Sequence, residues 1–254
     1  MKVIERLLGG LAADAPVRRV LMGAFWTAVS LDTDPPRCGL ASSLRGGPHV
    51  SGPPLPEAGR LQEHTARELA AWLRSDRVAE ASVGMAAYNA LLDVDESVCE
   101  EINAADIILS RSVGRRVVVV GHFPFVEDVA KTAAACTVLE LEPRTGDLPA
   151  RCAAEVLPTA DVVALTGTSL LNHTFDDLIG LCRPEAFVIL LGASAPLTPR
   201  LFAHGVDAVA GTRVTDVPAV MQAVSQGATF RQIPGKRLLT LTRNPRRAER
   251  ARGR

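Results

Sequence analysis

A run of four valines, Val117–Val120, constrains the fold of this chain more than any other feature. β-branched residues favour extended backbone, and a continuous apolar run that ends at a glycine predicts a strand buried on both faces. Strands of this kind occur in parallel sheets that helices cover. Such sheets bind ligands at the carboxyl ends of their strands, so the turn that follows, Gly121–Pro124, is the first place to look for a site.

Further β-rich runs recur after this one, with short helical segments between most of them. Strands that alternate with helices predict a doubly wound parallel sheet, so we expect a Rossmann-like α/β domain over residues 98–242. Before it, a hairpin formed by Val17–Leu31 and Cys38–Leu44, followed by two helices, predicts a smaller α+β domain over residues 1–97. The later strands are expected at Val138–Leu141, Val162–Thr166, Phe187–Leu191 and Val206–Val209.

The two helices of the smaller domain have local signals of their own. Thr65 and Glu68 form the pattern of a capping box, which predicts a helix start. The second helix, expected from about Val78 to Leu92, has a face of small residues that permits close backbone packing: Gly84, Ala86, Ala87 and Ala90. Asn89, on this helix, either faces the cleft between the domains or is an ordinarily packed polar residue.

Charge and cysteine content narrow the class of protein. The 28 Lys and Arg balance the 28 Asp and Glu, so no overall basic field favours a nucleic-acid partner. Residues 243–254 hold six Arg and one Glu, and we expect a solvated, disordered tail there. Charges interrupt the apolar residues at the N-terminus, so we expect neither a membrane segment nor a signal peptide, and a cytoplasmic location by default. Five cysteines without CxxC spacing argue against a disulfide framework and a zinc knuckle.

The segment Arg45–Gly59 contains eight Gly or Pro in fifteen residues and cannot be a regular element. A long loop of this kind is either a lid over a site or simply a mobile connection. The sequence leaves both interpretations open.

Several expected strands end in small or hydroxyl-bearing residues, and in a parallel sheet all such turns lie at one edge. Glycine lets a ligand approach the backbone, and free N–H groups with Ser or Thr hydroxyls suit an anion. The alternative is that tight turns use Gly and Ser for geometry alone. The candidate ligand residues in these turns are Gly121, His122, Pro124, Thr166, Gly167, Thr168, Asn172, Gly192, Ser194, Gly211, Thr212 and Asp216. Asn172 and Asp216 also occupy positions where helix caps are expected.

The first turn invites comparison with the dinucleotide fingerprint GxGxxG. Gly121 is correctly placed, and Glu140, 19 residues on, lies where a ribose-binding carboxylate is expected at the end of the second strand. However, His122 and Pro124 occupy positions where bulk obstructs a pyrophosphate and proline lacks an N–H. NAD binding is therefore disfavoured, whereas a mononucleotide or adenosyl ligand remains open.

His122 is the candidate metal ligand of the chain. An imidazole at a strand end serves as a general acid–base, as a metal ligand, or simply as a hydrogen-bond partner of a neighbouring loop. His173 follows another strand end, so the two imidazoles are expected to approach each other. No HxxxH or HExxH spacing occurs, which gives a preformed metal site little support.

Taken in order, the motifs GMAAYNALL, VGHFPF, TGTSLLN, LLGASAPLTP and GVDAVAGTRVTD resemble the putative heavy-metal-chelation domain family. The resemblance implies a Rossmann-like domain preceded by a domain similar to the enolase N-terminal fold, with a ligand site between them. His173 departs from the pattern, because a smaller residue is expected there. The positions that match, besides Pro196, are Asn89 and all of the turn residues named above.

Three hypotheses for function follow. The first is binding or processing of a small metal-chelating metabolite or metal complex, with a transition metal held in part by His122. The second is a biosynthetic enzyme that uses a nucleotide-like or S-adenosylmethionine-like ligand at Glu140. The third is a non-catalytic assembly protein, since the small-residue helix face allows a homodimer. We expect a small-molecule partner under the first two.

Overall fold

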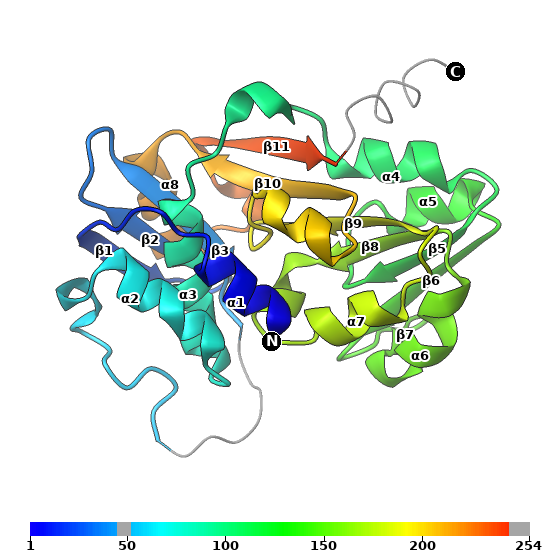
Figure 1. Ribbon diagram of the computed structural model, residues 1–254, viewed down its shortest axis with the longest axis horizontal. Helices are drawn as coiled ribbons and strands as arrows, with labels where there is room; N and C mark the ends of the chain where they lie inside the picture. Colours follow the sequence, from blue (N-terminus) through cyan, green and yellow to red (C-terminus); the bar gives the residue numbers. More distant parts are fainter. Residues whose placement is uncertain (45–51, 244–254) are drawn as a thin grey trace.

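The valine run forms β5 (Arg116–Val120) in the middle of an eight-stranded sheet, in a computed structural model that describes residues 1–44 and 52–243. The sheet order is β4-β11-β10-β9-β8-β5-β6-β7 (Figure 1). The six strands from β10 to β7 run parallel to their neighbours. They are β6 (Ala135–Glu140), β7 (Leu148–Pro149), β8 (Val162–Thr166), β9 (Phe187–Leu191) and β10 (Ala208–Val214), with β5 among them.

The order of these six strands is that of the dinucleotide-binding fold. From β5 the chain moves outward on one side through β6 and β7, then returns to β8 on the other side and continues through β9 and β10. Numbered along the chain, this is the 3-2-1-4-5-6 arrangement, in which ligands bind at the switch point. The switch point here lies between the carboxyl ends of β5 and β8, and the expected Rossmann-like fold is confirmed.

Two antiparallel strands extend the sheet beyond what the sequence predicted. They are β11 (Lys236–Thr242), which pairs with β10, and β4 (Cys99–Glu100), which pairs with β11. Gly211 and Thr212 are therefore not in a turn as expected, because β10 continues through them and pairs Gly211 with Leu239 and Thr212 with Leu238. The glycine is needed for packing, since a Cβ there would lie 2.6 Å from the Ala195 carbonyl oxygen.

Helices cover both faces of the large sheet (Figure 1). Alternate residues of β5 point to opposite sides, so that Val117 and Val119 pack with one group of helices and Val118 joins a core on the other side. The first face is covered by α4 (Ala104–Ser112) and α5 (Val126–Thr132), and the second by α6 (Ala153–Val156) and α7 (Phe175–Leu181).

The N-terminal sheet has three strands, β1 (Val17–Met22), β2 (Trp26–Leu31) and β3 (Arg37–Ser42), where the sequence predicted two. The prediction of one strand over Val17–Leu31 is wrong at Gly23, whose N–H donates to the Trp26 carbonyl oxygen at 2.8 Å and closes a tight turn. One face of this sheet packs on α3 (Val78–Leu91), which in turn packs on α2 (Ala66–Ala71). The other face packs on α8 (Val217–Ser225) of the C-terminal half.

The predicted close packing of α3 is confirmed. Gly84, Ala86, Ala87 and Ala90 are all buried, and a Cβ on Gly39 of β3 would lie 2.1 Å from the Ala86 carbonyl oxygen. The capping box is also present, with Thr65 Oγ1 accepting from the Glu68 N–H at 3.2 Å and the Glu68 carboxylate accepting from the Thr65 N–H at 2.8 Å.

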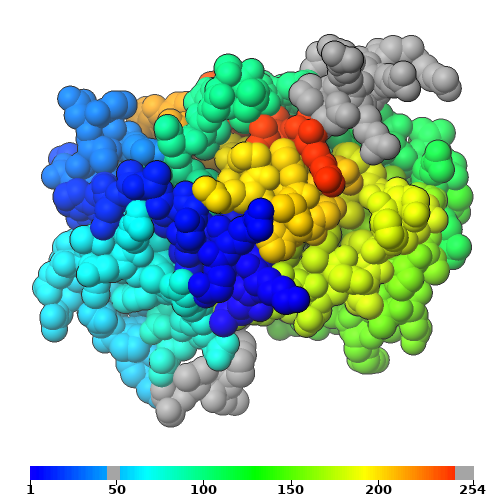
Figure 2. All heavy atoms as spheres, in the orientation of Figure 1, coloured from blue at the N-terminus to red at the C-terminus, as the bar shows by residue number. Residues whose placement is uncertain are grey.

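One apolar core runs through both halves of the chain, since Val29, Met85 and Val163 belong to the same buried cluster. The first helix, α1 (Lys2–Leu8), packs on α7 of the C-terminal half, and Figure 2 shows these residues lying across the junction. Asp176 of α7 lies 3.0 Å from the amino group of Met1.

Some predictions fall on residues whose structure is not described. Residues 45–51 of the glycine- and proline-rich segment and 244–254 of the basic tail lie outside the described ranges, so the lid and tail hypotheses stay predictions. Within residues 1–44 and 52–243, no helix has the length and apolar character needed to span a membrane.

Candidate functional site

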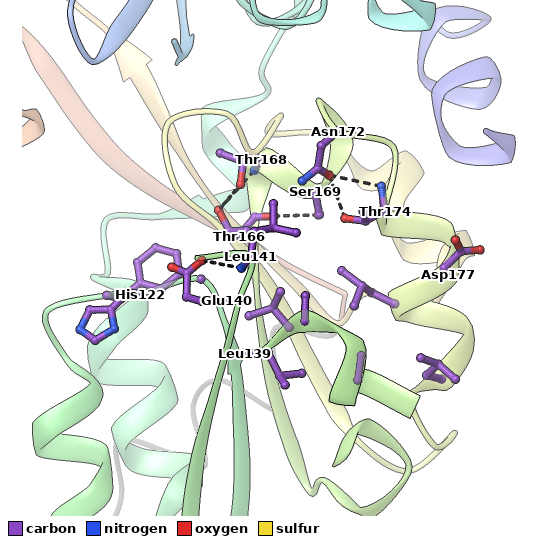
Figure 3. Close-up of a pocket in the computed structure, with 17 residues that line it drawn as sticks. His122, Leu139, Glu140, Leu141, Thr166, Thr168, Ser169, Asn172, Thr174 and Asp177 are labelled. Atoms are coloured by element: carbon purple, nitrogen blue, oxygen red, sulfur yellow. Dashed lines mark hydrogen bonds between the residues drawn. The ribbon is translucent and has the colours of Figure 1, made fainter. Parts of the chain in front are cut away.

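A pocket of about 420 Å³ opens at the carboxyl ends of β5, β6 and β8, beside the switch point (Figure 3). Its walls come from three strand ends, from the turn that follows β8, and from helices α6 and α7. All of its residues lie between positions 120 and 181, so this pocket is built within the C-terminal half. It is lined by Val120, Gly121, His122, Phe123, Leu139, Glu140, Leu141, Ala150, Ala153, Thr166, Thr168, Ser169, Asn172, Thr174, Asp177, Leu178 and Leu181.

The turn after β5 forms one side of the pocket. Gly121 has φ of +98°, which a side chain would strain, and a Cβ there would lie 3.1 Å from Thr166 Cβ. A glycine therefore allows the ends of β5 and β8 to come together at the switch point. Pro124, which was expected to contact a ligand, is exposed and does not line the pocket.

Glu140 is the last residue of β6 and lies on the same side of the pocket (Figure 3). Its Oε2 atom accepts a hydrogen bond from the Leu141 N–H at 3.2 Å, and among the described residues the carboxylate forms no other hydrogen bond or ion pair. Glu140 thus stands at the end of the second strand of the Rossmann order, the position predicted for a ribose-binding carboxylate.

Hydrogen-bonded hydroxyl groups and one side-chain amide form the wall of the pocket after β8. Thr166 Oγ1 and Thr168 Oγ1 lie 2.9 Å apart, and Ser169 Oγ donates to the Thr166 carbonyl oxygen at 2.7 Å. Asn172 Oδ1 accepts from the Thr174 N–H and hydroxyl at 3.3 and 2.8 Å, so Asn172 both caps the turn and lines the pocket. These bonds fix the wall before any ligand arrives.

The two histidines do not face each other as expected. His122 Nδ1 lies 3.4 Å from Asp147 Oδ2, at the edge of the pocket. His173 Nε2 instead bonds to the Leu73 carbonyl oxygen at 2.7 Å, toward the N-terminal half. His173 also has φ of +60°, which explains why a smaller residue was expected there.

The donors present do not fit a metal held by protein side chains alone. Among the described residues, no group of three or more His, Cys, Asp and Glu is close enough to bind an ion. Cysteines do not supply the missing donors, because none of the residues that line the pocket in the described part of the chain is a cysteine. Burial raises the pKa of the Cys38 thiol to about 12 and that of Cys182 to about 11. Those two thiols stay protonated at neutral pH and pack as small apolar side chains.

The other predicted site residues lie elsewhere and have structural roles. Asn89 donates to the carbonyl oxygens of Leu40 at 2.9 Å and Ala193 at 3.3 Å, and so ties the two sheets together. Ser194, in the turn that begins with Gly192 after β9, accepts from the Ser42 N–H at 2.8 Å. Gly167 permits close packing on Ala195, and Asp216 caps α8 by accepting from the Ala219 N–H at 3.0 Å.

Sequence reasoning missed several residues of the pocket, above all Asp177 on α7 and the apolar side chains of Leu139 and Leu178. The signal for Asp177 was present. Two aspartates follow Thr174 and Phe175 at the start of the helix after β8, which places them at the ligand edge of a parallel sheet.

The fold and the pocket define a class of protein: a Rossmann-order α/β protein with a pocket at its switch point, joined to a small α+β unit. Two family models match it, over residues 103–243 and 4–92, and both are described as putative heavy-metal chelation. The chain belongs to this family, and the predicted resemblance is confirmed.

Related proteins agree with this assignment. An uncharacterized protein of Methanocaldococcus jannaschii is 29% identical over 147 residues, which are 55% of this chain and 57% of that protein, so the match spans little more than half of the relative. Crystal structures of two family members of unknown function share the fold. The one from Desulfitobacterium hafniense has a TM-score of 0.83 at 23% identity, covering 95% of this chain and 98% of that one. The one from Pyrococcus horikoshii has a TM-score of 0.80 at 18% identity, covering 94% and 99%.

Proposed function

We propose that this protein binds a nucleoside-type ligand in the pocket at the carboxyl ends of β5, β6 and β8. The observation that carries the proposal is the place of Glu140, which ends the second strand of a 3-2-1-4-5-6 sheet and lines the pocket. In folds of this order, a carboxylate at that position accepts hydrogen bonds from ribose hydroxyls.

The rest of the pocket supports a ligand of this size and kind. Its volume of about 420 Å³ lies within the range of roughly 300–1,000 Å³ typical of small-molecule sites. Leu139, Leu178 and Leu181 supply apolar surface against which a base can pack, while Thr166 and Thr168 supply hydroxyls for polar groups. A small number of polar groups on an apolar wall is what orients a ligand.

Calorimetric titration with adenosine, guanosine, uridine, S-adenosylmethionine and NAD tests the proposal. We expect a nucleoside or adenosyl compound to bind and Glu140→Gln to weaken that binding by roughly 10–100-fold, because a hydrogen bond to a charged group contributes about 1.5–3 kcal/mol. Glu142→Gln is the matched control, since Glu142 is exposed and does not line the pocket. If the Glu140→Gln and Glu142→Gln variants bound the ligand equally well, Glu140 would not be the carboxylate that binds the ribose.

A second candidate, binding of a metal in complex with a small chelator, is favoured by one observation. Asp147 lies 3.4 Å from His122 Nδ1 and can hold the imidazole so that Nε2 is available to a metal. Because nearby protein donors are too few, the chelator would supply the remaining ligands. His64, which lies 2.9 Å from Glu57, offers the matched control.

In this second test, Ni²⁺ or Zn²⁺ is added with and without a tridentate chelator such as iminodiacetate, and the melting temperature is followed. His122→Ala should abolish a shift that needs both metal and chelator, whereas His64→Ala should retain it. A shift that survives His122→Ala would rule out His122 as the ligand.

A further inference from the structure

We infer that the pocket selects ligands that carry a positive charge and no phosphate, which narrows the proposed nucleoside class to cationic nucleosides. This inference rests on the proposed function, because it concerns the same pocket. It is drawn from the charges that surround the cavity, which the fold alone does not determine.

The lining of the pocket is acidic. Glu140 and Asp177 are its two carboxylates, and none of the described residues that line it is Lys or Arg. Figure 3 shows Glu140 at the end of β6 and Asp177 on α7, on opposite sides of the cavity. Arg151 is close in sequence to the lining residues Ala150 and Ala153, but it is exposed and is not part of the lining. A ligand held between the two walls therefore meets negative charge from both.

The helices beside the pocket add to this field. In dinucleotide-binding folds the helix after the first strand presents its amino end to a phosphate. Here that helix is α5, which has only seven residues and carries Glu127 and Asp128 in its first turn. Lys131 pairs with Asp128 at 2.6 Å and also attracts Glu127, so the two acids and one lysine leave this helix with a net charge of −1. A phosphate at this end would meet repulsion where the usual fold provides attraction.

The turn between β5 and α5 also differs from a glycine-rich phosphate-binding loop at one position. Pro124 has no N–H, so the turn lacks one of the backbone donors that a glycine-rich loop presents to a pyrophosphate. The absence of this donor and the acidic lining act in the same direction. Together they favour a ligand in which an ammonium or sulfonium group replaces the phosphate of a nucleotide.

Three ligands that differ only at one atom group test this inference: adenosine, 5′-amino-5′-deoxyadenosine and adenosine 5′-monophosphate. At neutral pH and low salt we expect the amino compound to bind about fivefold or more tightly than adenosine, and the monophosphate about fivefold or more weakly, since a charge near one carboxylate changes affinity by about that factor. Raising the salt concentration should shrink both differences.

Asp177→Asn should reduce the preference for the amino compound, while Asp106→Asn should not. The two aspartates are matched, because each is the third residue of its helix and exposed, and Asp106 lies on α4, over the other face of the sheet. Both substitutions remove the same favourable interaction with a helix dipole. A difference in ligand preference between the two variants therefore comes from the negative charge of Asp177 in the pocket.

The possible outcomes separate the inference from the proposed function. If no member of the series binds, or if Glu140→Gln leaves adenosine binding unchanged, the proposed function fails. If adenosine binds through Glu140 but the monophosphate binds more tightly, the charge inference is overturned. Loss of that tighter binding in Arg151→Ala would identify Arg151 as the phosphate ligand.

Discussion

The contact between β3 and α3 allows a sharp test of the packing of the N-terminal half. Gly39→Ala places a methyl group 2.1 Å from the Ala86 carbonyl oxygen, 2.4 Å from the Ala90 nitrogen and 2.8 Å from the Asn89 carbonyl carbon. All three are backbone atoms of one helix, so no side chain can rotate away. The strand and the helix must move apart.

The size of the effect follows from what this movement disturbs. Overpacking a tight core costs about 1–3 kcal/mol, and rigid backbone neighbours place this case at the upper end. Moving β3 also lengthens the 2.9 Å hydrogen bond from Asn89 to the Leu40 carbonyl, which contributes about 1 kcal/mol. We therefore expect the free energy of unfolding to fall by about 3–4 kcal/mol. At about 2–4 °C per kcal/mol for a chain of this size, the melting temperature should fall by roughly 6–16 °C.

Gly180→Ala is the control, measured with Gly39→Ala by urea denaturation and thermal melting. Gly180 lies in α7, and a Cβ there would meet nothing within 4 Å. The substitution should raise the free energy of unfolding by about 0.5–1 kcal/mol, because alanine has the higher helix propensity. If Gly39→Ala were as stable as the wild type, the close approach of β3 to α3 would be refuted.

Two further predictions concern single polar side chains. Thr65→Ala should lower the free energy of unfolding by about 1 kcal/mol in urea denaturation, because it removes half of a capping box; no change would show that the cap contributes nothing. The Arg116 N–H donates to Asp161 at 2.8 Å, and this bond, with the nearby Arg183, lowers the pKa of the carboxyl below 3.8. The ionised carboxylate stabilises the fold above pH 3.8, and this stabilisation is lost as the pH falls through the lowered pKa. The difference in free energy of unfolding between the wild type and Asp161→Asn should therefore narrow from pH 6 to pH 3. A gap independent of pH would contradict this.

Features set by short-range chemistry were predictable from the sequence. The capping box of Thr65, the cap of Asp216 and the small-residue face of α3 each depend on residues within one or two turns of the chain, and all three were confirmed. The valine run and the regular alternation of segments likewise predicted the parallel core, because burial on both faces requires a continuous apolar strand.

Features that depend on a distant partner were not predictable. The segment Lys236–Thr242 has no strong alternation, and it forms β11 because β10 offers it an edge to pair with. Gly211 suggested a turn, yet it lies inside β10 because Ala195 packs against its backbone. At Gly23 the chain reverses without an Asn-Gly or similar hairpin signal, so two strands looked like one.

The sequence predicted only part of the candidate site, because the site also depends on segments that are distant in the chain. Sequence order places five strand ends at one edge of the sheet, but strand order decides which of them are neighbours. The ends of β6 and β10 are four strand positions apart, about 19 Å at roughly 4.8 Å per strand, so one small ligand cannot contact both. Glu140 and Thr166 end the strands that flank β5 and share the pocket. Ser194 follows β9 and Thr212 lies within β10, and both are on the side of the N-terminal half. Since neighbouring strands in this fold can be far apart in the chain, the ligand residues could be named from the sequence but could not be assigned to one site.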